Sequence, residues 1–205
     1  MPILMSEIFP IHQYRMGGAS VYLMDVSNVD ENTFAAELPS ALLTYAYSTF
    51  KSQKRQKEWL GTRLLLKLVE GNNAEIGYTD TGAPILRNSL RHISVSHSGT
   101  FVAIALSDQH VGLDIQVITN KALRLKSRFL SEEEQLMLDS ESDIEGAVQL
   151  WCAKEAVYKY LSIPGTELIG GIVLQKHEDG VGESLHNLRI HCNKYENVVM
   201  AIAEK

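Results

Sequence analysis

Residues 150–161, LWCAKEAVYKYL, decide the fold assignment, because they combine the hydrophobic spacing of a buried helix with charges inside it. At about 100° per residue, this spacing places two adjacent stripes on the packed side of a helix. The stripes are Leu150, Lys154, Val157 and Leu161, and Trp151, Glu155, Tyr158 and Lys159. A buried carboxylate needs a cation, a metal or strong donors beside it. The pattern therefore predicts such a partner for Glu155, unless the lysines extend to solvent and Glu155 lies at the rim.

The segments around this helix predict an α+β fold. A helical pattern covers about 31–70, and the helix of residues 150–161 extends back to about Glu145. Between them, Ser131 and Glu134 form a capping box that opens another helix. The expected strands are 20–26, 74–79, 83–86, 92–96, 101–107, 111–118, 170–177, 187–192 and 197–204.

The sequence repeats one arrangement weakly. Trp59 and Lys67 have the same spacing as Trp151 and Lys159, and similar apolar runs, FVAIAL and VVMAIA, follow the two helices. This pattern predicts two similar α+β halves about a pseudo-twofold axis, each with a small, mainly antiparallel sheet and a long helix.

The expected boundary separates an N-terminal half, 1–110, from a C-terminal half, 111–205. The chain has 205 residues and is 45% hydrophobic, which is enough for two small halves that share one interface. Because the halves already meet each other, we expect a monomer.

The sequence predicts a cytoplasmic protein. No stretch approaches the roughly 20 apolar residues that span a bilayer, and the N-terminus, MPILMSEIFP, does not resemble a signal peptide. Cys152 and Cys192 form no CxxC motif, and we expect both to be free thiols in a reducing compartment.

Basic residues gather in two short windows of an acidic chain. The net charge is −6, which argues against general affinity for nucleic acid. Residues 51–67 and 121–128 nevertheless hold ten of the 19 lysines and arginines. Such windows indicate a polyanionic ligand or an acidic partner, or else two solvated helix faces.

Two motifs outside the helix suggest sites for a metal ion and for a phosphate. Asp114 lies in an apolar strand, VGLDIQVI, and with Glu155 it offers the hard oxygen ligands that suit Mg²⁺. In SHSG, the amides of the turn, the hydroxyls of Ser96 and Ser98 and the His97 imidazole are groups that hold phosphate oxygens. Each feature alone is also compatible with a structural role.

In the order TGAP (81–84), HISVSHSG (92–99), VGLDIQ (111–116) and WCAKEAVYK (151–159), these pieces resemble the 4′-phosphopantetheinyl transferase superfamily, surfactin-synthetase type. The resemblance covers roughly 50–165, and its specificity comes from the combination. It implies the two-half fold described above.

The resemblance also implies a reaction. The phosphopantetheine arm of coenzyme A would pass to a serine of an apo acyl or peptidyl carrier protein, with release of adenosine 3′,5′-bisphosphate. Mg²⁺ would be held on the pyrophosphate by Asp114 and Glu155, with Gln116 as a further ligand. The catalytic residues would be Glu155 as base, Lys159 facing the phosphates and His97 on a coenzyme A phosphate.

Coenzyme A would be bound by further residues that the motifs place. They are Lys57 on the 3′-phosphate, Arg63, Gly82, Pro84, Ser96, His97, Lys154 and Lys159. Lys154 would either pair with an acid or steady the phosphates. The basic window 121–128 would meet an acidic carrier protein.

Two departures from the family pattern keep alternatives open. Gln116 stands where many members have an acid, and Ala83 stands where they have the lysine of GKP. A homologue that binds coenzyme A or a carrier without transfer, a metal-dependent nucleotide hydrolase and a structural adaptor all remain compatible with the sequence. The identity of the carrier is not encoded in these motifs.

Overall fold

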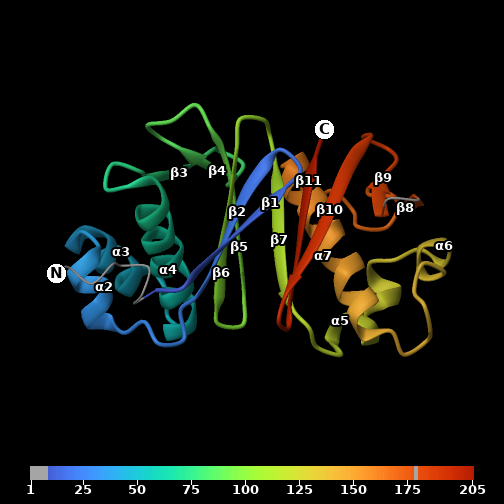
Figure 1. Ribbon diagram of the computed structural model, residues 1–205, viewed down its shortest axis with the longest axis horizontal. Coiled ribbons are helices and arrows are strands. Elements are labelled where there is room, and N and C mark those ends of the chain that lie inside the picture. Colours follow the sequence, from blue (N-terminus) through green and yellow to red (C-terminus); the bar gives the residue numbers. More distant parts are fainter. Residues whose placement is uncertain (1–8, 178–179) are drawn as a thin grey trace.

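Two antiparallel sheets occupy the middle of the structure, and a long helix covers the outer face of each (Figure 1). The computed structural model describes residues 9–177 and 180–205. This mixture of helices and antiparallel sheets confirms the α+β class. Residues 1–8 lie outside the described residues, and they make up most of the N-terminal segment in which no signal peptide was expected.

The first sheet has the strand order β1-β2-β6-β5, and each neighbouring pair is antiparallel. Its strands are β1 (Ile11–Met16), β2 (Ala19–Asp25), β5 (His92–Ser98) and β6 (Phe101–Ser107). The sequence predicted all but β1. The hairpin of β3 (Ile76–Tyr78) and β4 (Pro84–Leu86) stands beside this sheet.

Three helices replace the single helical pattern expected over 31–70. They are α2 (Glu31–Glu37), α3 (Ser40–Thr49) and α4 (Gln53–Glu70). The first break falls at Leu38, which is extended because a residue before proline is pushed out of the helical region. Ser52 opens α4 by accepting a hydrogen bond from the Arg55 amide.

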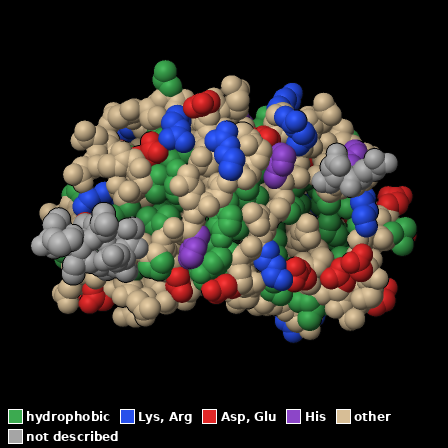
Figure 2. Space-filling model, in the orientation of Figure 1, with side chains coloured by type: hydrophobic (Ala, Val, Ile, Leu, Met, Phe, Trp, Pro, Cys, Tyr) green, Lys and Arg blue, Asp and Glu red, His purple; other side chains and the backbone are tan. Residues whose placement is uncertain are grey.

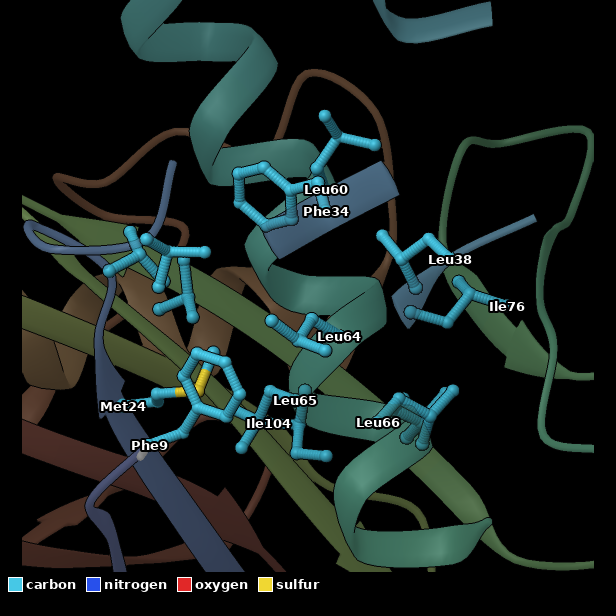
Figure 3. Packing of buried hydrophobic residues seen from close by; sticks show 14 of the residues in the cluster. Phe9, Met24, Phe34, Leu38, Leu60, Leu64, Leu65, Leu66, Ile76 and Ile104 are labelled. Atoms are coloured by element: carbon cyan, nitrogen blue, oxygen red, sulfur yellow. The ribbon is translucent and has the colours of Figure 1, made fainter. Parts of the chain in front are cut away.

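The outer face of the first sheet forms a hydrophobic core with these helices (Figure 3). Leu60, Leu64 and Leu65 of α4 lie almost fully buried between Phe34 of α2 and Ile104 of β6. The spacing of the leucines follows the helical period, so one face of α4 is apolar from Leu60 onward.

The second sheet has the strand order β7-β11-β10-β9-β8. Its strands are β7 (Gly112–Val117), β8 (Leu174–His177), β9 (Gly180–Glu183), β10 (Leu188–Tyr195) and β11 (Val198–Glu204). Helix α7 (Ile144–Leu161) lies against β7 and β11. At Gly112 a Cβ atom would overlap the backbone of Ala156 and Tyr160, so the glycine permits this close packing.

The link between β7 and α7 contains three short helical elements. They are α5 (Lys121–Arg124), a 3₁₀ turn at Lys126–Arg128 and α6 (Glu132–Gln135). The capping box predicted from Ser131 and Glu134 is present. The helix that it opens has only four residues.

The inner faces of the two sheets pack against each other. Leu23 and Ala103 of the first sheet share one buried cluster with Leu113, Ile115 and Met200 of the second. All seven residues of β6 and of β11 are buried, because each strand is covered on both faces. No helix in the described part of the chain is long and apolar enough to cross a membrane.

Strands β5 and β7 meet through serine side chains. The hydroxyl oxygens of Ser94, Ser96 and Ser98 accept hydrogen bonds from the amides of Leu113, Ile115 and Val117, at 2.9, 3.1 and 3.0 Å. We call these three bonds the serine seam. They join an edge strand of one sheet to an edge strand of the other.

Candidate functional site

A pocket of about 580 Å³ opens beside the serine seam. Residues of α4, the β3–β4 hairpin, β5, β7 and α7 line it. Its size is typical of sites for small molecules and cofactors. Of the predicted site residues, the pocket wall includes Arg63, Gly82, Pro84, Ser96, His97, Asp114, Gln116, Glu155 and Lys159.

Asp114 is fixed on the floor of the pocket. Its side chain points from the middle of β7, and the residue is only 3% exposed. One carboxylate oxygen, Oδ1, accepts hydrogen bonds from the Ser96 hydroxyl and from Lys159 Nζ, both at 2.8 Å. The other, Oδ2, accepts one from the side-chain amide of Gln116 at 2.9 Å. This oxygen therefore has room for a further ligand.

Lys159 crosses the seam from α7. Besides Asp114, its ammonium group donates to the Leu113 carbonyl of β7 at 2.9 Å and to the Val95 carbonyl of β5 at 3.2 Å. The side chain remains 29% exposed. A positive charge is thus held at a fixed place in the pocket wall.

Glu155 lies one turn before Lys159 and lines the pocket. Its carboxylate makes no hydrogen bond or ion pair with any described residue. Burial raises the pKa of Glu155 above its ordinary value, the charge of Asp114 raises it further, and Lys159 opposes the shift. A cation between the two carboxylates would relieve this cost.

The donor set fits Mg²⁺. The described residues contain no group of three or more acids, histidines and cysteines that could hold a metal. Asp114 and Glu155 supply two carboxylates, and the carbonyl oxygen of Gln116, 3.5 Å from the Ser98 hydroxyl, supplies a weaker third donor. An ion that keeps several waters, as Mg²⁺ does, needs no more from the protein.

The opposite wall carries His97, Glu58 and Arg55. Glu58 Oε2 lies 3.4 Å from His97 Nδ1, and Arg55 donates to His97 Nε2. Burial lowers the pKa of His97, Glu58 opposes the shift and Arg55 adds to it. The lowered pKa favours the neutral imidazole. Because a guanidinium can only donate, Nε2 accepts, and the proton of the neutral ring lies on Nδ1.

Arg55 and Glu58 were not among the predicted site residues. Glu58 is the single acid of the basic window 51–67 and is only 6% exposed. That isolated acid was a usable signal, because an acid among cations on a helix either pairs locally or turns inward. Glu58 does both, since it also lies 3.4 Å from Arg55.

Arg63 is held where α4 meets the β3–β4 hairpin. Its guanidinium lies 3.3 Å from the centre of the Trp59 ring and donates to the Tyr78 hydroxyl at 3.0 Å. Gly82 takes a positive φ of 84° in the hairpin turn, next to Pro84 on the same wall. A rigid cation of this kind suits a phosphate.

The structure does not bring Lys154 to the pocket. Its side chain is fully buried on another face of α7, and its ammonium contacts Glu134 Oε1 at 2.7 Å. It also donates to the carbonyl oxygens of Leu168 and Ile172 at 2.6 and 2.7 Å. All of its hydrogens are used, so it pairs with an acid and does not steady phosphates.

The side chains of two other predicted coenzyme A contacts, Lys57 and Ser96, bind protein groups in this structure. Lys57 donates to the Ser27 carbonyl at 2.7 Å and lies outside the pocket lining. Ser96 lines the pocket, but its one hydroxyl hydrogen is committed to Asp114. Lys57 keeps two ammonium hydrogens, so a phosphate contact by this side chain stays a prediction.

The basic window 121–128 forms α5 and the 3₁₀ turn, away from the pocket lining. Lys121, Arg124 and Arg128 are exposed there, whereas Lys126 pairs with Glu141 at 2.8 Å. On the face of the molecule in Figure 2, Lys and Arg side chains lie scattered among acidic ones.

Comparison with known proteins agrees with the motifs. Residues 110–202 match the family described as the 4′-phosphopantetheinyl transferase superfamily. The chain is 30% identical over 96 residues to the 4′-phosphopantetheinyl transferase Sfp of Bacillus subtilis (strain 168), which covers 43% of this chain and 41% of that protein. It is 32% identical over 71 residues to the transferase gsp of Aneurinibacillus migulanus, over 33% of this chain and 30% of the relative.

A third relative is the 4′-phosphopantetheinyl transferase psf-1 of Bacillus pumilus, with 37% identity over 82 residues, 38% of this chain and 35% of the relative. These matches confirm the resemblance to transferases of the surfactin-synthetase type. The matched segments span less than half the length of each of the three relatives.

Proposed function

We propose that this protein transfers the 4′-phosphopantetheine group of coenzyme A to a serine of an apo acyl or peptidyl carrier protein, releasing adenosine 3′,5′-bisphosphate. The observation that carries the proposal is the pocket floor. There Asp114 and Lys159 form a fixed pair beside Glu155, whose carboxylate has no partner among the described residues. The matched relatives are 4′-phosphopantetheinyl transferases by name, which supports the same reaction.

The reaction depends mainly on positioning and on neutralising charge. Lys159 and Arg63 offer cations to the pyrophosphate and the phosphate of coenzyme A from two sides of the pocket. His97 would contact a phosphate beside Arg55 by turning its Nδ1–H away from Glu58. Asp114 and Glu155, with Gln116, would hold Mg²⁺, which when bound neutralises charge on the pyrophosphate.

Glu155 is the proposed base for the carrier serine. Its carboxylate lines the pocket, and no protein group among the described residues occupies its oxygens. As the serine hydroxyl attacks the phosphorus on the pantetheine side, its proton passes to Glu155 and the bond to the bisphosphate breaks.

The proposal includes the arrangement of the whole protein. The two sheet-and-helix units would be two halves, 1–110 and 111–205, about a pseudo-twofold axis, and the protein would be a monomer. The exposed arginines Arg124 and Arg128 would meet an acidic carrier protein. Two free cysteines, Cys152 and Cys192, are compatible with a cytoplasmic location.

Mass spectrometry of apo carrier proteins tests the proposal directly. Each carrier is incubated with the protein, coenzyme A and Mg²⁺, and an Asp114→Asn variant serves as the inactive control. We expect a mass gain of one phosphopantetheine on the carrier serine. Coenzyme A binding without a mass gain would indicate a non-catalytic homologue, and bisphosphate release without carrier would indicate a hydrolase.

A further inference from the structure

The serine seam contains three hydroxyls that bind the backbone of β7 in the same way. Ser94, Ser96 and Ser98 alternate along β5, so their side chains point to the same side of the strand, toward β7. Each accepts one amide hydrogen of β7, at 2.9 to 3.1 Å. With respect to joining the sheets, the three residues do the same work.

Ser96 differs in what its own hydrogen does. A serine hydroxyl has one hydrogen to donate and can accept from other groups. Because the Ile115 amide donates to Ser96 Oγ, the hydroxyl is oriented to donate to Asp114 Oδ1, at 2.8 Å. Ser94 has no such bond to Asp114, and Ser98 Oγ lies 3.5 Å from Gln116.

We propose that Ser96 is a positioning residue that orients the Asp114 carboxylate. The Ile115 amide, the Ser96 hydroxyl and the Asp114 carboxylate form a chain of two hydrogen bonds, which we call the relay. Both of its ends lie on β7, at the adjacent residues Ile115 and Asp114. Ser96 is 4% exposed, so water does not replace the bond at low cost. The relay turns Oδ1 toward β5 and Lys159, which leaves Oδ2 toward the pocket.

This inference rests on the proposed function for its kinetic consequence, but not for its structural one. A hydrogen bond to a charged group contributes enough that its loss lowers activity by roughly ten- to a hundredfold. The loss should lower kcat and the affinity for a divalent cation. KM for coenzyme A should stay within about twofold, because Ser96 makes no hydrogen bond with the side chains of Arg63 or His97.

The test compares Ser96→Ala with Ser94→Ala. Both variants remove one bond of the seam, but only the first removes a bond to Asp114. Four measurements are made on each full-length protein: melting temperature, Mg²⁺ affinity by calorimetry without substrates, steady-state transfer kinetics, and the crystallographic position of the Asp114 carboxylate. Ser96→Thr keeps the hydroxyl and serves as the rescue variant.

We expect similar melting temperatures for the two alanine variants, with Mg²⁺ affinity and kcat at least tenfold lower in Ser96→Ala and largely recovered in Ser96→Thr. In Ser96→Ala alone, the Asp114 carboxylate should be rotated or should occupy two conformations. Equal parameters and an unmoved carboxylate in the two alanine variants would overturn the inference. If the wild type transfers nothing, the proposed function fails, and the carboxylate position still decides the role of Ser96.

Discussion

Helix α7 carries two lysine–carboxylate pairs that differ in what surrounds them. Lys154 meets Glu134 where both side chains are almost fully buried, and Glu134 also accepts hydrogen bonds from the amides of Ser131 and Leu174. Lys159 meets Asp114 at the floor of an open pocket. Both ammonium groups also contact two backbone carbonyls.

The difference lies in the neighbouring acid. Around Lys154 every buried side-chain donor and acceptor of the described residues has a protein partner. Around Lys159 the carboxylate of Glu155 has none among the described residues, and its pKa is raised. A buried ion pair therefore marks a structural element when it is saturated, and a candidate site when an unpartnered charge lies beside it.

The largest effect should come from removing the lysine of the buried pair, Lys154 and Glu134. Lys154→Met leaves the Glu134 carboxylate buried without its cation, and we expect a loss of about 3–5 kcal/mol in the free energy of unfolding. Urea denaturation followed by circular dichroism measures it. Lys159→Met is the matched control, and its loss should be clearly smaller because this side chain is partly exposed. Equal losses would contradict the distinction between the pairs.

Removing the charge of the open pair should act on activity. Asp114→Asn keeps the size of the side chain but removes the negative charge next to the proposed cation. We expect kcat for carrier modification to fall by about 10²–10³-fold, the range for losing one preorganised electrostatic contact. Turnover measured at saturating coenzyme A and Mg²⁺ checks this. An unchanged rate would remove the basis for the metal site.

The unpartnered carboxylate predicts how stability depends on pH. Because the pKa of Glu155 is raised in the folded protein, the folded state holds this proton at pH values where the unfolded state has lost it. Its contribution to stability therefore decreases as pH rises from about the ordinary glutamate value of 4.5 through the raised pKa.

Glu155→Gln removes this penalty. We expect the variant to melt at a higher temperature than the wild type at pH 8 without Mg²⁺, with the difference shrinking toward pH 4, although the variant should transfer nothing. Thermal melts at a series of pH values measure the difference. A variant that is less stable than the wild type at pH 8 would show that Glu155 has a stabilising partner.

The smallest effect should come from a change at the surface, away from both lysine–carboxylate pairs. Arg124→Glu changes an exposed charge on α5, and we expect KM for an acidic carrier to rise about two- to fivefold, since single surface charges contribute about 0.2–1 kcal/mol. KM for coenzyme A should stay constant. Lys51→Glu, another exposed basic position, is the matched control. Equal changes in both Michaelis constants would contradict a docking role for α5.

The sequence allowed much of the open pair to be predicted, but not the closed one. Asp114, Glu155 and Lys159 stand in motifs whose order is informative, and they line one pocket. Helical periodicity could not separate Lys154 from them, because its partners come from Glu134, 20 positions away, and from a loop without regular spacing. Side-chain periodicity reports which face of a helix is packed, not what it is packed against.

The same limit explains the other differences. The serines of HISVSHS alternate visibly in the sequence, yet the strand that they bind is given only by the folded arrangement of two sheets. The helical pattern of 31–70 did not show where its three helices begin and end. At the first break, Pro39 acts locally on Leu38, whereas hydrophobic spacing continues across it. The class of fold survives such errors because it depends on the number and type of elements more than on their ends.

The ammonium group of Lys159 ties together carbonyls from both sheets as well as the carboxylate of Asp114. Were it to swing toward a phosphate, the junction of the sheets would keep only its hydroxyl bonds at this point. The same nitrogen would then serve both to hold the sheets together and to bind the ligand. A phosphate bound in the pocket would therefore weaken the junction between the two sheets.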